Sequence, residues 1–162
     1  MTAAGKSVTG QKLAQLLRCQ FVDTDALIEK KAQCSIADIF AAKGEPFFRQ
    51  REQEALQTAL ADDACIIATG GGVVLAAENR RLICAGGWVV YLQATTEVLL
   101  SRLRDDAKRP LLMNDAPAAL ARMAAEREPL YEKIAHLSVV QTANDTPAII
   151  ADKIHAGLRC LG

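Results

Sequence analysis

The chain has 162 residues, which predicts one domain over residues 1–162, with little room for a second hydrophobic core. Lys plus Arg and Asp plus Glu both number 19, so the formal charge is zero and no global positive field would recruit nucleic acid or an acidic membrane. The uncharged stretch 64–77 is broken by three glycines and is too short to span a bilayer. Five widely spaced cysteines predict buried thiols in the reducing cytoplasm.

The first half of the chain alternates between helical and strand patterns, which predicts an α/β protein with crossover helices. We expect a helix over 6–18 and a short strand over 19–22. Ser35 and Asp38 have the spacing of a capping box that opens a short helix, which Gly44 ends. A longer charged helix over 45–61 and a buried strand over 65–69 follow.

The second half continues the same alternation. The elements expected there are a strand over 88–92, a helix from Thr95 or Thr96 to Arg104, a helix over 118–127, a strand over 137–141, and a C-terminal helix that begins at Thr146 and Pro147. The segment 105–117 has no clear periodicity, so it is predicted to be a mobile surface loop.

Gly5, Lys6 and Ser7 match the last three positions of the phosphate-binding loop G-x-x-x-x-G-K-[ST]. In such a loop, backbone N–H groups surround the phosphates, the lysine neutralises their oxygens and the hydroxyl ligates Mg²⁺. The first glycine of the motif and the strand that leads into it are missing before Met1. Taken alone, the triplet is equally consistent with an ordinary helix start.

Two aspartates end the strand expected at 19–22. The period of two in an extended segment places Asp23 and Asp25 on the same side, at the carboxyl end of the strand, where ligands bind in open parallel sheets. The alternative is a helix cap formed by Asp23 or Thr24. A helix cap needs only one of these side chains, so two carboxylates at this point favour a ligand site.

Three successive glycines, 70–72, follow the strand expected at 65–69. They would let a ligand approach the backbone, although a tight turn is the simpler alternative. Arg49 and Arg127, each taken singly, are best explained as solvated helix charges.

In combination, the motifs G-K-S, F-V-D-T-D, S-I-A-D-I-F, F-R-x-x-E, G-G-G, V-V-Y-L, R-P-L-L and R-x-P-L-Y occur in this order. This set resembles the shikimate kinase family from Gly5 to the C-terminal helix. The resemblance implies a three-layer P-loop kinase fold with helices on both faces of a parallel sheet, five-stranded in the family. It also implies transfer of the ATP γ-phosphoryl group to the 3-hydroxyl of shikimate, in chorismate biosynthesis.

The resemblance also implies roles for single residues. Lys6 would grip the phosphates, Ser7 would ligate Mg²⁺, and Asp23 would help to hold that ion through water. The nucleotide-binding residues would be Ala3, Ala4, Gly5, Lys6, Ser7, Val8, Arg102, Arg109 and Pro147, with Arg102 and Pro147 flanking adenine. The shikimate-binding residues would be Asp25, Arg49, Gly71, Gly72 and Arg127, with Asp25 also accepting the proton. Arg109 would close over the phosphates from a lid at about 105–117.

The nucleotide loop departs from the family pattern. Ala3 stands where a glycine is common, and Val8 replaces a frequent Ser or Thr. Without the first strand, two neighbouring strands would lack a partner, and we expect the chain to be a shortened form. A non-catalytic binding module and a kinase for another hydroxy acid such as gluconate are the alternatives. The expected partners are ATP and shikimate, bound by a monomer without nucleic acid or membrane.

Overall fold

The computed structural model describes residues 3–61, 65–104 and 116–161. Helices and strands alternate along the chain, as predicted. In order, the elements are α1 (Lys6–Leu17), β1 (Gln20–Asp23), α2 (Thr24–Ala32), α3 (Ile36–Leu60), β2 (Cys65–Ala68), η1 (Val73–Leu75), α4 (Ala77–Gly86), β3 (Val90–Ala94), α5 (Thr96–Arg104), α6 (Ala116–Ile134), β4 (Leu137–Gln141) and α7 (Pro147–Arg159).

The strands of the described residues form two separate parallel pairs instead of one continuous sheet. β1 pairs with β2, with Asp23 opposite Ala68, and β3 pairs with β4, with Ala94 opposite Gln141. A cavity of about 510 Å³ lies between the pairs, and apolar side chains such as Ile66 of β2 and Val90 of β3 line it. Each described strand therefore has one pairing partner, and no pairing joins β2 to β3.

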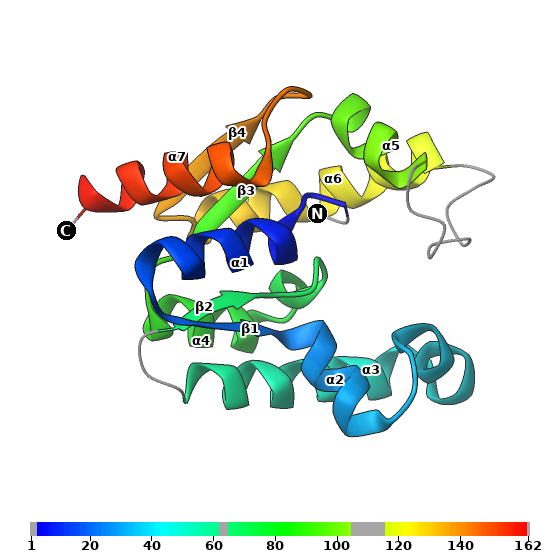
Figure 1. Ribbon diagram of the computed structural model, residues 1–162. Coiled ribbons are helices and arrows are strands. Elements are labelled where there is room, and N and C mark those ends of the chain that lie inside the picture. The colour runs from blue at the N-terminus through cyan, green and yellow to red at the C-terminus, as the bar shows by residue number, and fades with distance from the viewer. Residues whose placement is uncertain (1–2, 62–64, 105–115, 162) are drawn as a thin grey trace.

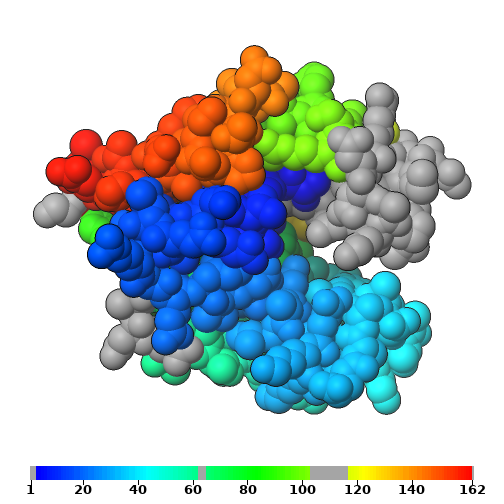
Figure 2. All heavy atoms as spheres, in the orientation of Figure 1, coloured from blue at the N-terminus to red at the C-terminus, as the bar shows by residue number. Residues whose placement is uncertain are grey.

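Helices cover both sides of the strands. In the view of Figure 1, α7 lies in front of the β3–β4 pair and α6 lies behind it. One core cluster joins α1 and α7 to the strands through Leu13, Val139 and Ile150, and another joins α3, η1 and α6 around Leu56. Figure 2 shows α1, in dark blue, between α7 above and α2 below. The first helix thus connects the two strand pairs.

The predicted caps are present. The Ser35 hydroxyl accepts a hydrogen bond from the Asp38 N–H at 3.1 Å, and the Asp38 carboxylate accepts one from the Ser35 N–H at 3.2 Å. Gly44 has φ +76°, which breaks the helical path inside α3 and separates the two helices expected there. Thr146 caps α7, with Pro147 at its first position.

Several boundaries differ from the prediction, most of all those of β3 and α6. β3 begins at Val90 instead of Trp88, because Val89 N–H donates to the Nδ1 atom of His136 at 3.0 Å and Trp88 packs edge-on against that imidazole. α6 continues seven residues beyond 127, to Ile134, because its last turns pack against η1 and α3. Its start at 116 also shortens the loop predicted over 105–117, of which 105–115 lies outside the described residues.

The prediction of five buried thiols is wrong. Cys34, Cys84 and Cys160 are exposed, while Cys19 and Cys65 are half-buried. The exposed three lie at helix ends or in turns, where no core element covers them. A sequence count of cysteines carries no information about these local positions.

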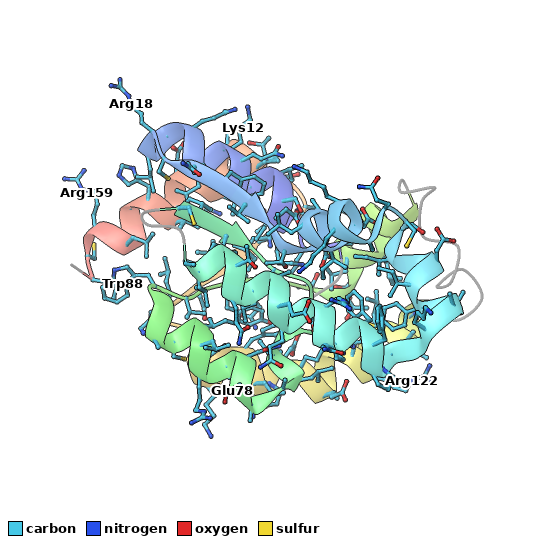
Figure 3. All side chains as sticks on the ribbon, turned by 90° about the horizontal axis from the view of Figure 1, so that it is seen from below. Lys12, Arg18, Glu78, Trp88, Arg122 and Arg159 are labelled. Atoms are coloured by element: carbon cyan, nitrogen blue, oxygen red, sulfur yellow. The ribbon has the colours of Figure 1, made fainter. Side chains whose placement is uncertain are left out.

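The surface carries its charges on several elements. Figure 3 shows Lys12 and Arg18 projecting outward from α1 and its C-terminal end, Arg122 from α6 and Arg159 from α7, with Trp88 at the same end as Arg18 and Arg159. Among the described residues, no helix combines the length and the apolar character needed to cross a membrane.

Asp145 stabilises the turn between β4 and α7, and this predicts a pH effect. Its carboxylate accepts hydrogen bonds from Lys153 at 2.8 Å and from the Thr142 N–H at 2.7 Å, which together lower the pKa of Asp145 to about 2. The stabilisation is therefore present above the unfolded-state pKa and is lost as pH falls toward 2. We expect the difference in melting temperature between the wild type and Asp145→Asn to narrow from pH 5 to pH 3. An unchanged difference would contradict this.

Candidate active site

The loop before α1 has an unusual backbone. Ala3 and Gly5 have φ values of +58° and +75°, in the left-handed region. For alanine, this conformation costs about 1–2 kcal/mol, so surrounding contacts must hold it. Gly5 caps α1 and its carbonyl accepts from the Thr9 N–H at 3.0 Å. Lys6 is the first residue of the helix, where its charge and the N-terminal N–H groups favour an anion.

Side chains from α5 and β4 contact this loop. Arg102 Nη1 donates to the Ala3 carbonyl at 3.4 Å, and the buried Gln141 Nε2 donates to the Ala4 carbonyl at 3.1 Å. Arg102 and Gln141 also bond to each other at 2.9 Å. The structure thus places Arg102 beside the predicted nucleotide loop. Pro147 begins α7 farther along the chain, and half of the Val8 side chain is exposed on α1.

Ser7 and Asp23 meet directly. The Ser7 hydroxyl donates to Asp23 Oδ2 at 2.5 Å, across the gap between α1 and the end of β1. Asp23 Oδ1 caps α2 by accepting from the Asp25 N–H at 3.0 Å. One oxygen of Asp23 therefore forms the helix cap, and the other accepts from Ser7.

These two residues fit a magnesium ion. Mg²⁺ is commonly held by one or two protein oxygens together with phosphate oxygens and water, and a hydroxyl beside a carboxylate is such a pair. No cluster of three or more His, Cys, Asp or Glu side chains suitable for a metal occurs among the residues described. A site completed by the nucleotide is consistent with both findings.

Asp25 lies beside the glycines that follow β2. A Cβ atom on Gly70 would lie 2.7 Å from Asp25 Oδ1 and 3.1 Å from Glu52 Oε1, so only glycine leaves room for both carboxylates. The parallel register of β1 and β2 brings these two chain ends together. Two buried carboxylate oxygens therefore converge on one point.

Arg49 and Glu52 form the central ion pair of this cluster. Arg49 Nη1 lies 2.8 Å from Glu52 Oε2, and Glu52 is 1% exposed. Burial raises the pKa of Glu52, the charge of Arg49 opposes this, and Asp25 adds to the rise. Burial lowers the pKa of Arg49, but its bonds to Glu52 and Glu45 outweigh burial and raise it. Arg49 also lies where a side chain on Gly72 would be.

Arg127 reaches the same glycines from α6. Its Nη1 atom donates to the Gly71 carbonyl at 3.4 Å, and the Tyr131 hydroxyl donates to that carbonyl at 2.5 Å. Burial raises the pKa of Tyr131 to about 12, with the charge of Arg127 acting in the opposite direction, so the phenol stays a donor. Gly71 is thus held through its carbonyl.

The structure therefore brings most of the predicted residues into two adjoining groups. Asp25, Arg49, Gly71, Gly72 and Arg127 form the first, and the loop from Ala3 to Ser7 with Asp23 and Arg102 forms the second. Arg109 lies outside the described residues. Glu52, Tyr131 and Gln141 were not predicted to be site residues from the sequence. Glu52 could have been found, because it follows Arg49 by one helical turn, whereas Gln141 has no local signal.

The family model for shikimate kinase matches residues 2–159. The chain belongs to the shikimate kinase family. Shikimate kinase of Francisella tularensis subsp. holarctica is 46% identical over 153 residues, which are 93% of this chain and 86% of that protein. The corresponding figures for the Vibrio cholerae enzyme are 41% over 152 residues, 93% and 87%.

The fold agrees with this assignment. The structure of shikimate kinase from Acinetobacter baumannii in complex with shikimate matches with a TM-score of 0.92 and 36% identity, covering 99% of this chain and 89% of that one. The enzyme from Aquifex aeolicus matches with a TM-score of 0.83 and 30% identity, covering 97% and 91%. Members of the family are ATP-dependent phosphotransferases, and the gluconate alternative finds no support among these relatives.

Proposed function

We propose that this chain transfers the γ-phosphoryl group of ATP to the 3-hydroxyl of shikimate, giving shikimate 3-phosphate and ADP. The observation that carries the proposal is the cluster of Asp25, Arg49 and Gly70 beside the Ser7–Asp23 pair. A carboxylate substrate with ring hydroxyls needs cations on one side and acceptors on the other. This cluster supplies both, next to a loop suited to phosphates.

On the nucleotide side, Lys6 would neutralise the β and γ phosphates at the start of α1. Ser7 and Asp23 would hold Mg²⁺, which supplies charge neutralisation at the phosphates when it is bound. The backbone from Ala3 to Val8 would surround the phosphates, and Arg102 and Pro147 would flank the adenine. Arg109, outside the described residues, would offset the charge that develops during transfer.

On the acceptor side, Arg49 and Arg127 would bind the substrate carboxylate. Glu45 is the exposed partner of Arg49, so a substrate carboxylate can replace it, while the buried Glu52 keeps the guanidinium in place. Asp25 would bind the attacking hydroxyl and accept its proton. Gly71 and Gly72 would contact the ring through the backbone. The active form would be a cytoplasmic monomer.

The direct test measures ADP release from MgATP with and without shikimate. We expect ADP formation that depends on shikimate and saturates with it, because phosphoryl transfer needs a positioned acceptor. Gluconate at the same concentration serves as the control acceptor. Equal rates with and without shikimate would overturn the substrate assignment, and binding of both ligands without turnover would favour the non-catalytic alternative.

A further inference from the structure

Gln141 is a buried polar side chain at the end of β4. It is 1% exposed, and its amide group is used at both ends. Nε2 donates to the Ala4 carbonyl at 3.1 Å, and Oε1 accepts from Arg102 Nη1 at 2.9 Å. Among side chains, an amide both donates and accepts in this way, whereas a carboxylate only accepts.

Both partners belong to the candidate nucleotide site. Arg102 also donates to the Ala3 carbonyl at 3.4 Å, and its Nη1 lies 3.6 Å from where a Cβ atom of Gly5 would be. One buried amide and one guanidinium therefore hold two successive carbonyls of the loop. These carbonyls lie within the turn from Ala3 to Gly5, whose left-handed residues have the least intrinsic preference for their conformation.

We propose that Gln141 is a positioning residue for nucleotide binding. It holds the Ala3–Gly5 turn and the Arg102 guanidinium in one arrangement, so that the adenosine nucleotide meets a site already formed. The proposal rests on the nucleotide site proposed above, and Gln141 acts through Ala4 and Arg102 without touching the ligand. A preformed site binds more tightly because less ordering remains to be done on binding.

The residues proposed to bind the nucleotide and those proposed to bind shikimate lie on different elements. Gln141 and Arg102 stand on β4 and α5, while Asp25 and Arg49 stand on α2 and α3, beside the other strand pair. Loss of the Gln141 bonds should therefore weaken nucleotide binding and leave shikimate binding unchanged. A glutamine that only fills the core would not produce this separation.

The experiment compares Gln141→Met with Gln93→Met. Methionine keeps the length and volume of glutamine but forms neither bond. Gln93 is the matched control, since it is a half-buried glutamine on the adjacent strand β3 whose side chain forms no hydrogen bond among the described residues. We expect Gln141→Met to raise the Kd for MgADP, measured by calorimetry, and the KM for ATP about tenfold. The KM for shikimate and the Kd values of Gln93→Met should stay within twofold of wild type.

A second comparison tests the route through Arg102. In an Arg102→Ala background, Gln141→Met should raise the Kd for MgADP by a smaller factor than in the wild type, because one of the two partners of Gln141 is already absent. Amide hydrogen exchange at residues 3–8 should also become faster in Gln141→Met. If Gln141→Met does not fold, Gln141→Asn replaces it, because the shorter amide cannot reach both partners.

The outcomes are separable. An ADP Kd within twofold of wild type in a folded variant overturns the inference, as does an equal rise in KM for both substrates. If the wild type binds no ADP, the inference fails with the nucleotide site. If the wild type binds ADP but does not phosphorylate shikimate, the proposed function fails. The Kd for MgADP of Gln141→Met relative to that of the wild type still decides the role of Gln141.

Discussion

Asp25→Asn is expected to lower kcat for shikimate phosphorylation by about 10²–10⁴-fold, the usual contribution of a general base. The amide keeps the shape of the side chain but cannot accept the proton of the attacking hydroxyl. The KM values for ATP and shikimate should change much less, because Arg49 and Lys6 remain. Steady-state kinetics with each substrate varied in turn measures all three quantities.

The same substitution should not destabilise the fold. Asp25 lies close to the buried Glu52, and its negative charge raises the pKa of that carboxyl group, so the two repel each other. A neutral amide removes this repulsion, and we expect the melting temperature to stay level or rise. Asp152→Asn, on the exposed face of α7, is the control for a lost surface carboxylate. A loss of kcat below tenfold would reduce Asp25 to a residue that only orients the substrate.

Arg49→Lys should raise the KM for shikimate by about 10–100-fold. Lysine keeps the charge but loses the planar fork, and a charge-assisted hydrogen bond contributes about 1.5–3 kcal/mol. The substitution also removes the guanidinium contact at 2.8 Å to the buried Glu52, so a lower melting temperature is expected as well. The KM for ATP should stay within twofold, because Arg49 lies on the acceptor side.

Arg51→Lys is the matched control for this experiment. Arg51 lies two residues along the same helix and pairs with Glu54 at 2.7 Å, away from the glycines. We expect it to change neither KM. If Arg49→Lys weakens ATP binding and leaves the KM for shikimate unchanged, then the groups around Arg49 and Arg102 have been assigned to the wrong substrates.

The sequence predicted the element order well, because hydrophobic periodicity, caps and glycines are local signals. Ser35 with Asp38, Gly44, and Thr146 with Pro147 each specify a helix end from adjacent residues alone. The start of β3 was misplaced because Trp88 and Val89 continue the apolar run of the strand. Their position is determined by His136, which is 47 residues distant from Val89.

The candidate site was predictable only in part. Asp23 ends β1, but the strand alternation expected to carry on to Asp25 is wrong, because α2 begins at Thr24 and Asp25 lies in its first turn. The division of the Asp23 oxygens between a cap and Ser7 depends on how α1 crosses β1. Glu52 resembles an ordinary helix charge until its burial of 99% is known. Gln141 becomes recognisable only when its contacts across 137 residues are seen.

The cavity between the strand pairs has a mechanical consequence. Asp25 and Gly70 follow the strands of one pair, while Gln141 ends a strand of the other, and no backbone hydrogen bonds join β2 to β3. The distance between the two groups of site residues therefore depends on elements that bridge the pairs, chiefly α1 and the stacked rings of Tyr91 and Tyr131, whose centroids lie 4.9 Å apart. Any ligand or segment that tightens this junction would fix the distance between these two groups of residues.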